Sequence, residues 1–262
     1  RPGTDLRGNK IAVDVSLYVH KYIYGTIKSI TQDPMFLQTL DSLTKEQFLE
    51  KFEDKVYEET ARAIIRYFHS LRKKFDIKFE FVFDGKGPEV KKDERERRDK
   101  QRQGIRNKLN DDENDVENFI KYIPYSFSIN HAKFNPLLRQ LLEDKGFSTK
   151  QAEGEAERDC CIGYKNGTYD GILTLDTDCI AMGCDIIMNI NSLSFEITNR
   201  NKFMKINSIA DDKQFLDYCI MLGCDYNTNM YGIGPVRALR LIRKHGSIEK
   251  IPIEDDKKEC LN

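Results

Sequence analysis

The 262-residue chain lacks the features that mark several broad classes of protein. No apolar run approaches the ~20 residues that a membrane-spanning helix needs, which excludes a membrane-embedded protein. The first ten residues lack an apolar core, so they are not a secretory signal. Internal repeats are also absent, whereas 15 Phe and 12 Tyr require a packed interior and argue against wholesale disorder. We therefore expect an intracellular globular protein of one large domain or two small ones.

Cysteine and histidine are too scattered to predict a metal site of their own. The seven cysteines, an odd number without a secretion signal, are expected to be reduced thiols. Two pairs, Cys179-x4-Cys184 and Cys219-x4-Cys224, have a spacing that zinc could use. They flank predicted strands and a predicted helix, so we expect buried apolar packing instead. The four histidines show no ligand spacing.

The net charge of −1 lacks the basic excess that is typical of nucleic-acid-binding proteins. Its distribution is uneven, however. Residues 86–108 carry ten basic and five acidic residues, and residues 237–250 carry five basic residues and one acidic residue. The rest of the chain therefore has a net charge of −10. Two basic patches on an otherwise acidic chain keep nucleic acid open as a partner.

Hydrophobic patterns predict strands that alternate with helices. Strands are expected at residues 10–15, 77–83, 171–175 and 186–190. Helices are expected at residues 16–30, 44–74, 137–145, 153–164, 213–222 and 235–245. Thr44 and Gln47 have the spacing of a capping box, and residues 31–43, which include Pro34, are expected to form a loop. The alternation predicts an α/β fold with a mostly parallel central sheet flanked by helices.

Acidic residues follow three of the predicted strands. Asp14 and Asp84 come at the ends of two of them, and Asp176 and Asp178 follow a third. Ligands of open α/β sheets bind in the crevice beyond these strand ends. A single such Asp often only caps the next helix, but several at one edge repel one another unless cations neutralise them. Oxygen ligands without His or Cys suit Mg²⁺ or Mn²⁺, and two ions ~4 Å apart can act on a phosphodiester.

Six sequence strings together resemble the flap endonuclease branch of the structure-specific 5′ nucleases. In chain order they are IAVDVS, FVFDGKGPEVK, AEGEAERDC, LTLDTDCIAMG, LGCDY and GIGPVRALRLIRKHGSIEKI, whereas residues 26–76 and 104–135 match poorly. The resemblance implies a PIN-like nuclease core at residues 1–207, with a helical gateway or arch inserted at 85–135. It also implies a helix–two-turn–helix region at 208–262 packed on that core, and a role in DNA replication and repair.

The resemblance further implies seven carboxylates that hold two Mg²⁺ ions, for which Mn²⁺ can substitute. One ion would be held by Asp14, Asp84, Glu155 and Glu157. The second would be held by Asp176 and Asp178, with Asp225 helping through water. Glu153 also fits the run of alternating acids, but the register with Glu155 and Glu157 leaves the flanking residues at the positions that the family pattern gives them.

Residues that touch DNA follow from the same resemblance. Lys91 and Arg98 fall at the gateway positions where cations meet the scissile phosphate and offset its developing charge. The alternative for this charged run is a solvated single helix. His20 falls where the family places an aromatic residue or His that stacks on a base near the cut, and ordinary packing is its alternative.

The last basic patch resembles the helix–two-turn–helix of this superfamily. Its glycines, Gly232 and Gly234, let the backbone approach phosphates, and Arg237 lies on the helix that follows. Such an element binds the backbone of one strand of duplex DNA independently of its sequence. Family members often bind K⁺ here through backbone carbonyls and a Ser hydroxyl, but this chain has Asn229 where that Ser would be, which argues against a K⁺ site.

The leading hypothesis is a Mg²⁺-dependent nuclease that cuts branched DNA near the junction of a 5′ flap. A 5′→3′ double-strand exonuclease is the alternative that His20 mildly favours; a Holliday-junction resolvase and a ribonuclease are others. A non-catalytic junction-binding protein is the alternative from another class, although a pure binder would gain from losing carboxylates near phosphate.

The ends of the chain depart from the family pattern. Only thirteen residues precede Asp14, and the chain stops soon after the helix–two-turn–helix. We expect either a trimmed sequence or a compact member such as a viral one, located in the nucleus or in an infected host cell. No sliding-clamp motif is visible, and we expect a monomer.

Overall fold

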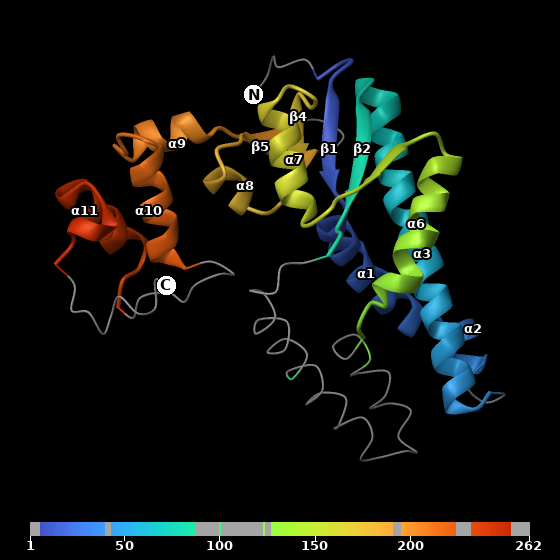
Figure 1. Ribbon diagram of the computed structural model, residues 1–262. Coiled ribbons are helices and arrows are strands. Elements are labelled where there is room, and N and C mark those ends of the chain that lie inside the picture. Colours follow the sequence, from blue (N-terminus) through green and yellow to red (C-terminus); the bar gives the residue numbers. More distant parts are fainter. Residues whose placement is uncertain are drawn as a thin grey trace.

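Six strands form one sheet in the order β3-β2-β1-β4-β5-β6 (Figure 1). The computed structural model describes residues 6–39, 43–86, 100, 123, 127–190, 195–223 and 232–252. The strands are β1 (Lys10–Asp14), β2 (Lys78–Phe83), β3 (Ser148–Gln151), β4 (Gly171–Leu173), β5 (Ile186–Ile190) and β6 (Phe195–Thr198). All neighbouring pairs are parallel except β5 and β6. The predicted α/β fold with a mostly parallel sheet is confirmed.

The sequence pattern does not predict the two edge strands. β3 has the sequence STKQ, and three of its four residues are exposed, so no apolar alternation marks it. It is placed by backbone pairing with β2, in which Phe81 lies beside Thr149. β6 pairs antiparallel with β5 and contains Glu196 among partly buried residues. Both edge strands are therefore defined by backbone pairing with the neighbouring strand.

Alternation along the central strands divides the core between the two faces of the sheet. Ile11 and Val13 join one cluster, whose helices include α1 (Val15–Thr31), α3 (Lys45–Phe75) and α6 (His131–Asp144). Ala12 joins the other cluster, whose helices include α7 (Ala156–Lys165), α8 (Asp178–Ala181), α10 (Asp212–Leu222) and α11 (Pro235–His245). The short helices α2 (Pro34–Leu37), α9 (Arg200–Ile206) and η3 (Ile248–Lys250) complete the described elements. The predicted division of the chain at residue 207 stays a prediction.

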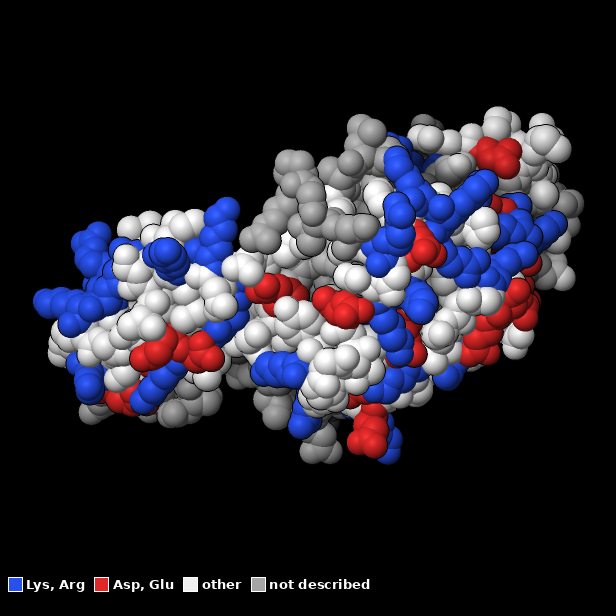
Figure 2. All heavy atoms as spheres, turned by 90° about the horizontal axis from the view of Figure 1, so that it is seen from above, with Lys and Arg blue, Asp and Glu red and all other residues white. Residues whose placement is uncertain are grey.

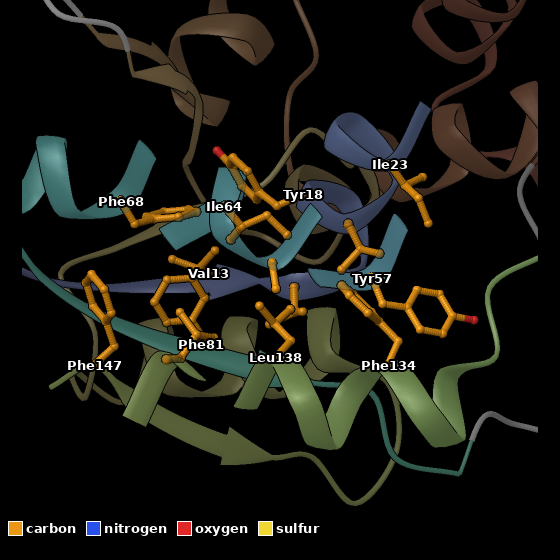
Figure 3. Packing of buried hydrophobic residues seen from close by; sticks show 14 of the residues in the cluster. Val13, Tyr18, Ile23, Tyr57, Ile64, Phe68, Phe81, Phe134, Leu138 and Phe147 are labelled. Atoms are coloured by element: carbon orange, nitrogen blue, oxygen red, sulfur yellow. The ribbon is translucent and has the colours of Figure 1, made fainter. Parts of the chain in front are cut away.

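Aromatic rings dominate the first of these clusters (Figure 3). Phe68 of α3 packs edge-on against Phe81 of β2, with ring centroids 4.7 Å apart. Phe81 in turn packs edge-on against Phe147 at 5.4 Å. Phe134 and Leu138 point from α6 toward the same core, and both are fully buried. Each fully buried side chain of this size contributes about 1.5–3 kcal/mol, so the sheet and these three helices hold together as one unit.

Several helix boundaries confirm local signals in the sequence, whereas others differ from them; α7, for example, begins at Ala156, three residues later than predicted. The capping box of α3 is present, because Gln47 N donates to Thr44 Oγ1 at 3.3 Å and Thr44 N donates to Gln47 Oε1 at 3.1 Å. The expected loop at residues 31–43 instead contains α2, which has Pro34 at its first position and an Asp33 cap. α6 begins six residues earlier than predicted, with Pro136 inside it. No described helix has the length and apolar character to cross a membrane.

Candidate active site

Three of the predicted ligands lie where neighbouring parallel strands end. Asp14 is the last residue of β1, and Asp84 directly follows β2. In the register of the sheet, Asp14 lies beside Val82 and Val13 lies beside Leu173. Asp176 follows the end of β4 by three residues. The carboxyl ends of β2, β1 and β4 therefore bring these side chains to one edge of the sheet.

Asp14 is the most buried of the six predicted ligands that the structure describes, with only 2% of its surface exposed. It caps α1, where its Oδ1 accepts a hydrogen bond from Ser16 N at 3.1 Å. Burial, together with the negative charges of Asp84 and Asp176, raises the pKa of Asp14 to about 7. The Ser16 hydrogen bond acts in the opposite direction. Asp84 and Asp176 are thus each close enough to Asp14 to disfavour its negative charge.

Asp84 connects the end of β2 to two other elements. Its Oδ2 accepts a hydrogen bond from the Ser16 hydroxyl on α1. Its Oδ1 accepts one from Ala156 N, the first residue of α7, at 2.8 Å. The backbone oxygen of Asp84 accepts a third from Gln151 Nε2 at 2.5 Å. The first two bonds hold the carboxylate toward α1 and α7.

The acidic run before α7 lies beside Asp84, because Ala156 at the start of α7 is hydrogen-bonded to the Asp84 carboxylate. Glu155 is the N-terminal cap residue of α7, and Glu157 lies in its first turn. Both are partly buried, whereas Glu153 is exposed. Gly85 N donates to Gly154 O at 2.7 Å, which brings the two segments together. The assignment of Glu155 and Glu157 as ligands stays a prediction.

The remaining pair of aspartates lies in the turn between β4 and α8. Asp178 is the first residue of α8, and its N donates to Asp176 Oδ1 at 2.8 Å. Asp176 N donates to Thr174 Oγ1 at 3.0 Å, and that threonine is fully buried. This turn therefore has a fixed backbone, and it keeps both side chains partly exposed at the edge of the sheet.

The described residues contain no group of three or more His, Cys, Asp or Glu side chains arranged to hold a metal ion. The chemistry of the donors nevertheless fits Mg²⁺, because all six described carboxylates offer oxygen alone. The mutual repulsion at Asp14 is the kind that a cation relieves. Three predicted site residues, Asp225, Lys91 and Arg98, lie outside the described residues.

The predicted DNA-contacting residues lie on α1 and at the start of α11. His20 is exposed on α1, and its ring meets that of His131. Gly232 has a φ of +75°, which favours glycine, and its carbonyl accepts a hydrogen bond from Arg237 Nη1 at 3.1 Å. Gly234 is the N-terminal cap residue of α11 and provides no side-chain cap. The backbone N–H groups of this helix start can therefore face an anion.

Four buried thiols belong to the second core cluster and not to the candidate site. They are Cys160, Cys161, Cys179 and Cys184, and Cys219 is partly buried. Burial raises the pKa of the Cys160 thiol above its ordinary range. Cys179 and Cys184 thus confirm the expected apolar packing, whereas Cys224 lies outside the described residues.

The end of the molecule opposite the candidate site carries basic side chains, whereas the candidate site is acidic. Figure 2 views the protein from the end at which the parallel strands begin, and Lys and Arg side chains gather over the part built from α3 and its neighbours. Lys73 and Lys74 at the end of α3 and Lys78 at the start of β2 are exposed there. Cations at the C-terminus of a helix interact favourably with its dipole. This structural role is sufficient to explain Lys73 and Lys74 at the end of α3.

Sequence reasoning missed three residues that hold the acidic residues in place: Ser16 bonds the Asp84 carboxylate, whereas Gln151 and Thr174 bond the backbone of Asp84 and of Asp176. Ser16 follows Asp14 by two residues, and Thr174 precedes Asp176 by two, but nothing in their spacing marks them. Each forms its bond across a turn or between strands. A polar residue at the end of a buried strand is the only signal that the sequence offers for them.

The chain is similar to several nucleases. The XPG I-region family matches residues 146–225. Flap endonuclease 1-B of Oryza sativa subsp. indica is 31% identical over 258 residues, which cover 94% of this chain and 57% of that protein. The catalytic core of Rad2 in complex with DNA substrate has a TM-score of 0.62 at 20% identity and covers 94% of this chain and 65% of its own. The flap endonuclease-1 from Methanococcus jannaschii has a TM-score of 0.58 at 19% identity, covering 98% and 79%.

These similarities differ in what they show. The structural similarity to the solved proteins, at 19–20% sequence identity, shows the fold alone, an α/β core with a mostly parallel sheet. The sequence matches extend over most of this chain, but the chain spans only about three fifths of the length of the curated relatives. Activity and substrate therefore need a separate argument from the site itself.

Proposed function

We propose that this chain, a member of the superfamily of structure-specific 5′ nucleases, hydrolyses DNA phosphodiesters near a junction of single and double strands. Its preferred substrate is a duplex with a 5′ flap. The observation that carries the proposal is the convergence of Asp14, Asp84 and Asp176 at the carboxyl edge of the sheet. In a protein that only binds DNA, these carboxylates would repel the phosphates and lower the affinity. A metal-dependent hydrolase needs the carboxylates to hold its cations.

The carboxylates divide into two sets around this edge. Asp14, Asp84, Glu155 and Glu157 hold one Mg²⁺, and Asp176 and Asp178 hold the second, with Asp225 assisting through water. Bound ions would polarise the scissile phosphodiester and offset the charge that develops on it. Ser16 and Ala156 orient the Asp84 carboxylate through their hydrogen bonds. Thr174 orients the turn that carries the second set.

Three further parts of the chain act on the DNA. His20 contacts a base near the cut, and the start of α11, with Gly232, Gly234 and Arg237, contacts the phosphates of the duplex. The segment at residues 85–135 is the gateway for the single strand. The nuclease core at residues 1–207 and the region at 208–262 work as one monomer on this substrate.

The experiment that tests the proposal is single-turnover cleavage of an end-labelled 5′-flap duplex, with Mg²⁺ and with EDTA. Wild type is compared with Asp178→Ala, and binding of the same DNA is measured for both. We expect one Mg²⁺-dependent product near the junction, and its loss in Asp178→Ala while binding is retained. Cleavage by the variant would remove Asp178 from the metal site. Binding without cleavage in Mg²⁺ and in Mn²⁺ would point to a junction-binding protein.

A 5′→3′ exonuclease is the second candidate, because the family resemblance favours it for a His at position 20, and His20 is exposed on α1. A ladder of mononucleotide products from the same duplex would favour it over a flap endonuclease.

Lys91 and Arg98 are proposed to act on the scissile phosphate from the gateway. Arg98→Ala should slow the chemical step more than it weakens binding, because an arginine that meets developing charge stabilises the transition state more than the ground state. Single-turnover rates at saturating enzyme separate the two effects. Equal rates for variant and wild type would contradict this role.

A further inference from the structure

Two imidazole rings from distant parts of the chain meet beside the candidate site. His20 lies on α1, and His131 is the first residue of α6. Their ring centroids are 6.5 Å apart and their planes are inclined by 70°, an edge-to-face arrangement. Both residues are exposed to solvent. Figure 1 shows α1 and the first turn of α6 at the same end of the molecule, beyond the carboxyl ends of the strands.

The first turn of α6 is fastened to α3, which fixes the place of His131. Asn130 N donates a hydrogen bond to Tyr57 Oη at 2.7 Å, and Tyr57 Oη donates one to Glu53 Oε1 at 2.7 Å. The other oxygen of Glu53 binds Lys133 Nζ at 2.9 Å. Tyr57 is buried, so this connection is anchored in the core. A residue on such a scaffold keeps its position when its neighbour moves.

His20 lies on α1, six residues after Asp14, the residue that caps that helix, which is about 9 Å along the helix axis. That distance is comparable to the spacing of two or three stacked nucleobases. A ring at this place can contact a base close to the phosphodiester that the carboxylates address. An imidazole on a helix surface has several rotamers, and packing against a second ring reduces their number before the DNA arrives.

We propose that His131 is a positioning residue, which holds the ring of His20 in the orientation that stacks on the base next to the cut. The proposal rests on the proposed function of the chain as a DNA nuclease. In this role the ring of His131 contacts the ring of His20, and His131 makes no bond to phosphate. A side chain of similar flat shape should therefore replace it, whereas a hydrogen-bonding side chain without a ring should not.

Three substitutions of His131 separate these chemistries. His131→Phe keeps a ring, His131→Asn keeps a polar donor, and His131→Ala keeps neither. His69→Ala, an exposed histidine of α3, is the matched control. The readouts are the single-turnover cleavage rate of the flap duplex, and the fluorescence of 2-aminopurine placed next to the cut, which stacking quenches. Melting temperatures show that each variant is folded.

We expect His131→Ala and His131→Asn to lower the cleavage rate about tenfold and to weaken the quenching on binding, with His131→Phe within about twofold of wild type. In the background of His20→Ala, a further His131→Ala should have no effect, because the ring it holds is gone. Additive losses would overturn the proposal, as would rescue by Asn instead of Phe.

The same data separate this proposal from that of the nuclease. If wild type cleaves and all His131 variants equal it, only the pairing of the two histidines is wrong. If wild type binds DNA without cleaving it, hydrolysis is wrong and the fluorescence decides the pairing. If wild type does not bind the flap duplex, both proposals are wrong.

Discussion

The carboxylate of Asp84 accepts a hydrogen bond from the backbone N–H of Ala156 at 2.8 Å, although the two residues are 72 positions apart. The bond joins the end of β2 to the first turn of α7, which carries Glu155 and Glu157. It also satisfies one of the N–H groups that a helix start leaves without an intrahelical partner. Because one oxygen is engaged in this way, Asp84 has a structural role as well as its proposed role toward metal.

Two substitutions of Asp84 should separate these roles. Asp84→Asn keeps an oxygen that can accept from Ala156, whereas Asp84→Ala removes it and leaves the N–H without this partner. We expect Asp84→Ala to lower the free energy of unfolding by about 1–2 kcal/mol, and Asp84→Asn to lower it less. Both should lose Mg²⁺-dependent cleavage, because neither keeps the charge. Denaturant unfolding and the flap assay measure the two effects, and full cleavage by Asp84→Asn would show that its charge is not needed.

The buried Asp14 should make the metal-free protein less stable as pH rises. Its pKa is raised to about 7 in the folded protein, mainly by burial, and lies near 3.8 when the chain is unfolded. The folded state therefore binds the Asp14 proton more tightly than the unfolded state does. The stability that this proton contributes is complete below about pH 4 and is lost as the pH rises to about 7. Asp14→Asn should remove that part of the pH dependence and raise the melting temperature at pH 8 in EDTA.

Addition of Mg²⁺ provides the control for Asp14. At pH 8 the ion should raise the melting temperature of wild type, because it binds the folded state alone, and should have a smaller effect on Asp14→Asn. A variant that is less stable than wild type at pH 8 in EDTA would contradict the repulsion inferred at this edge.

Gly85 should tolerate no side chain, because it passes against the backbone of residues 152–153. A Cβ at this position would lie 2.6 Å from Glu153 O and closer still to Ala152 O. We expect Gly85→Ala to lower the free energy of unfolding by roughly 2–4 kcal/mol and to reduce cleavage, since the segment beside Asp84 must shift. Thermal unfolding and the flap assay measure both.

Gly25 offers a matched control in α1. A Cβ there meets nothing within 4 Å, and the residue lies inside a helix. Gly25→Ala should therefore stabilise the protein by about 0.5–1 kcal/mol, because alanine loses less backbone entropy in a helix. Equal effects of the two substitutions would mean that the close approach at Gly85 is not maintained in solution.

Local signals in the sequence were sufficient for much of the fold. Strand β1 is an apolar run and β2 an alternating aromatic-rich segment, and the capping box of Thr44 and Gln47 starts α3 where their spacing predicts. Strand ends also determined part of the candidate site, because parallel strands bring Asp14, Asp84 and Asp176 to one edge whatever surrounds them. A pattern of period two or 3.6 depends only on neighbours along the chain, so the sequence alone contains it.

The tertiary structure decided everything that depends on a partner far away in the chain. β3 has an exposed polar sequence and becomes a strand only beside β2. The hydrogen bonds that Asp84 accepts from Ser16 and Ala156, and the ring contact of His20 with His131, join residues that no spacing connects. Such contacts exist only after the intervening loops are closed, and the direction of a side chain toward its partner is set by the packing of whole helices against the sheet.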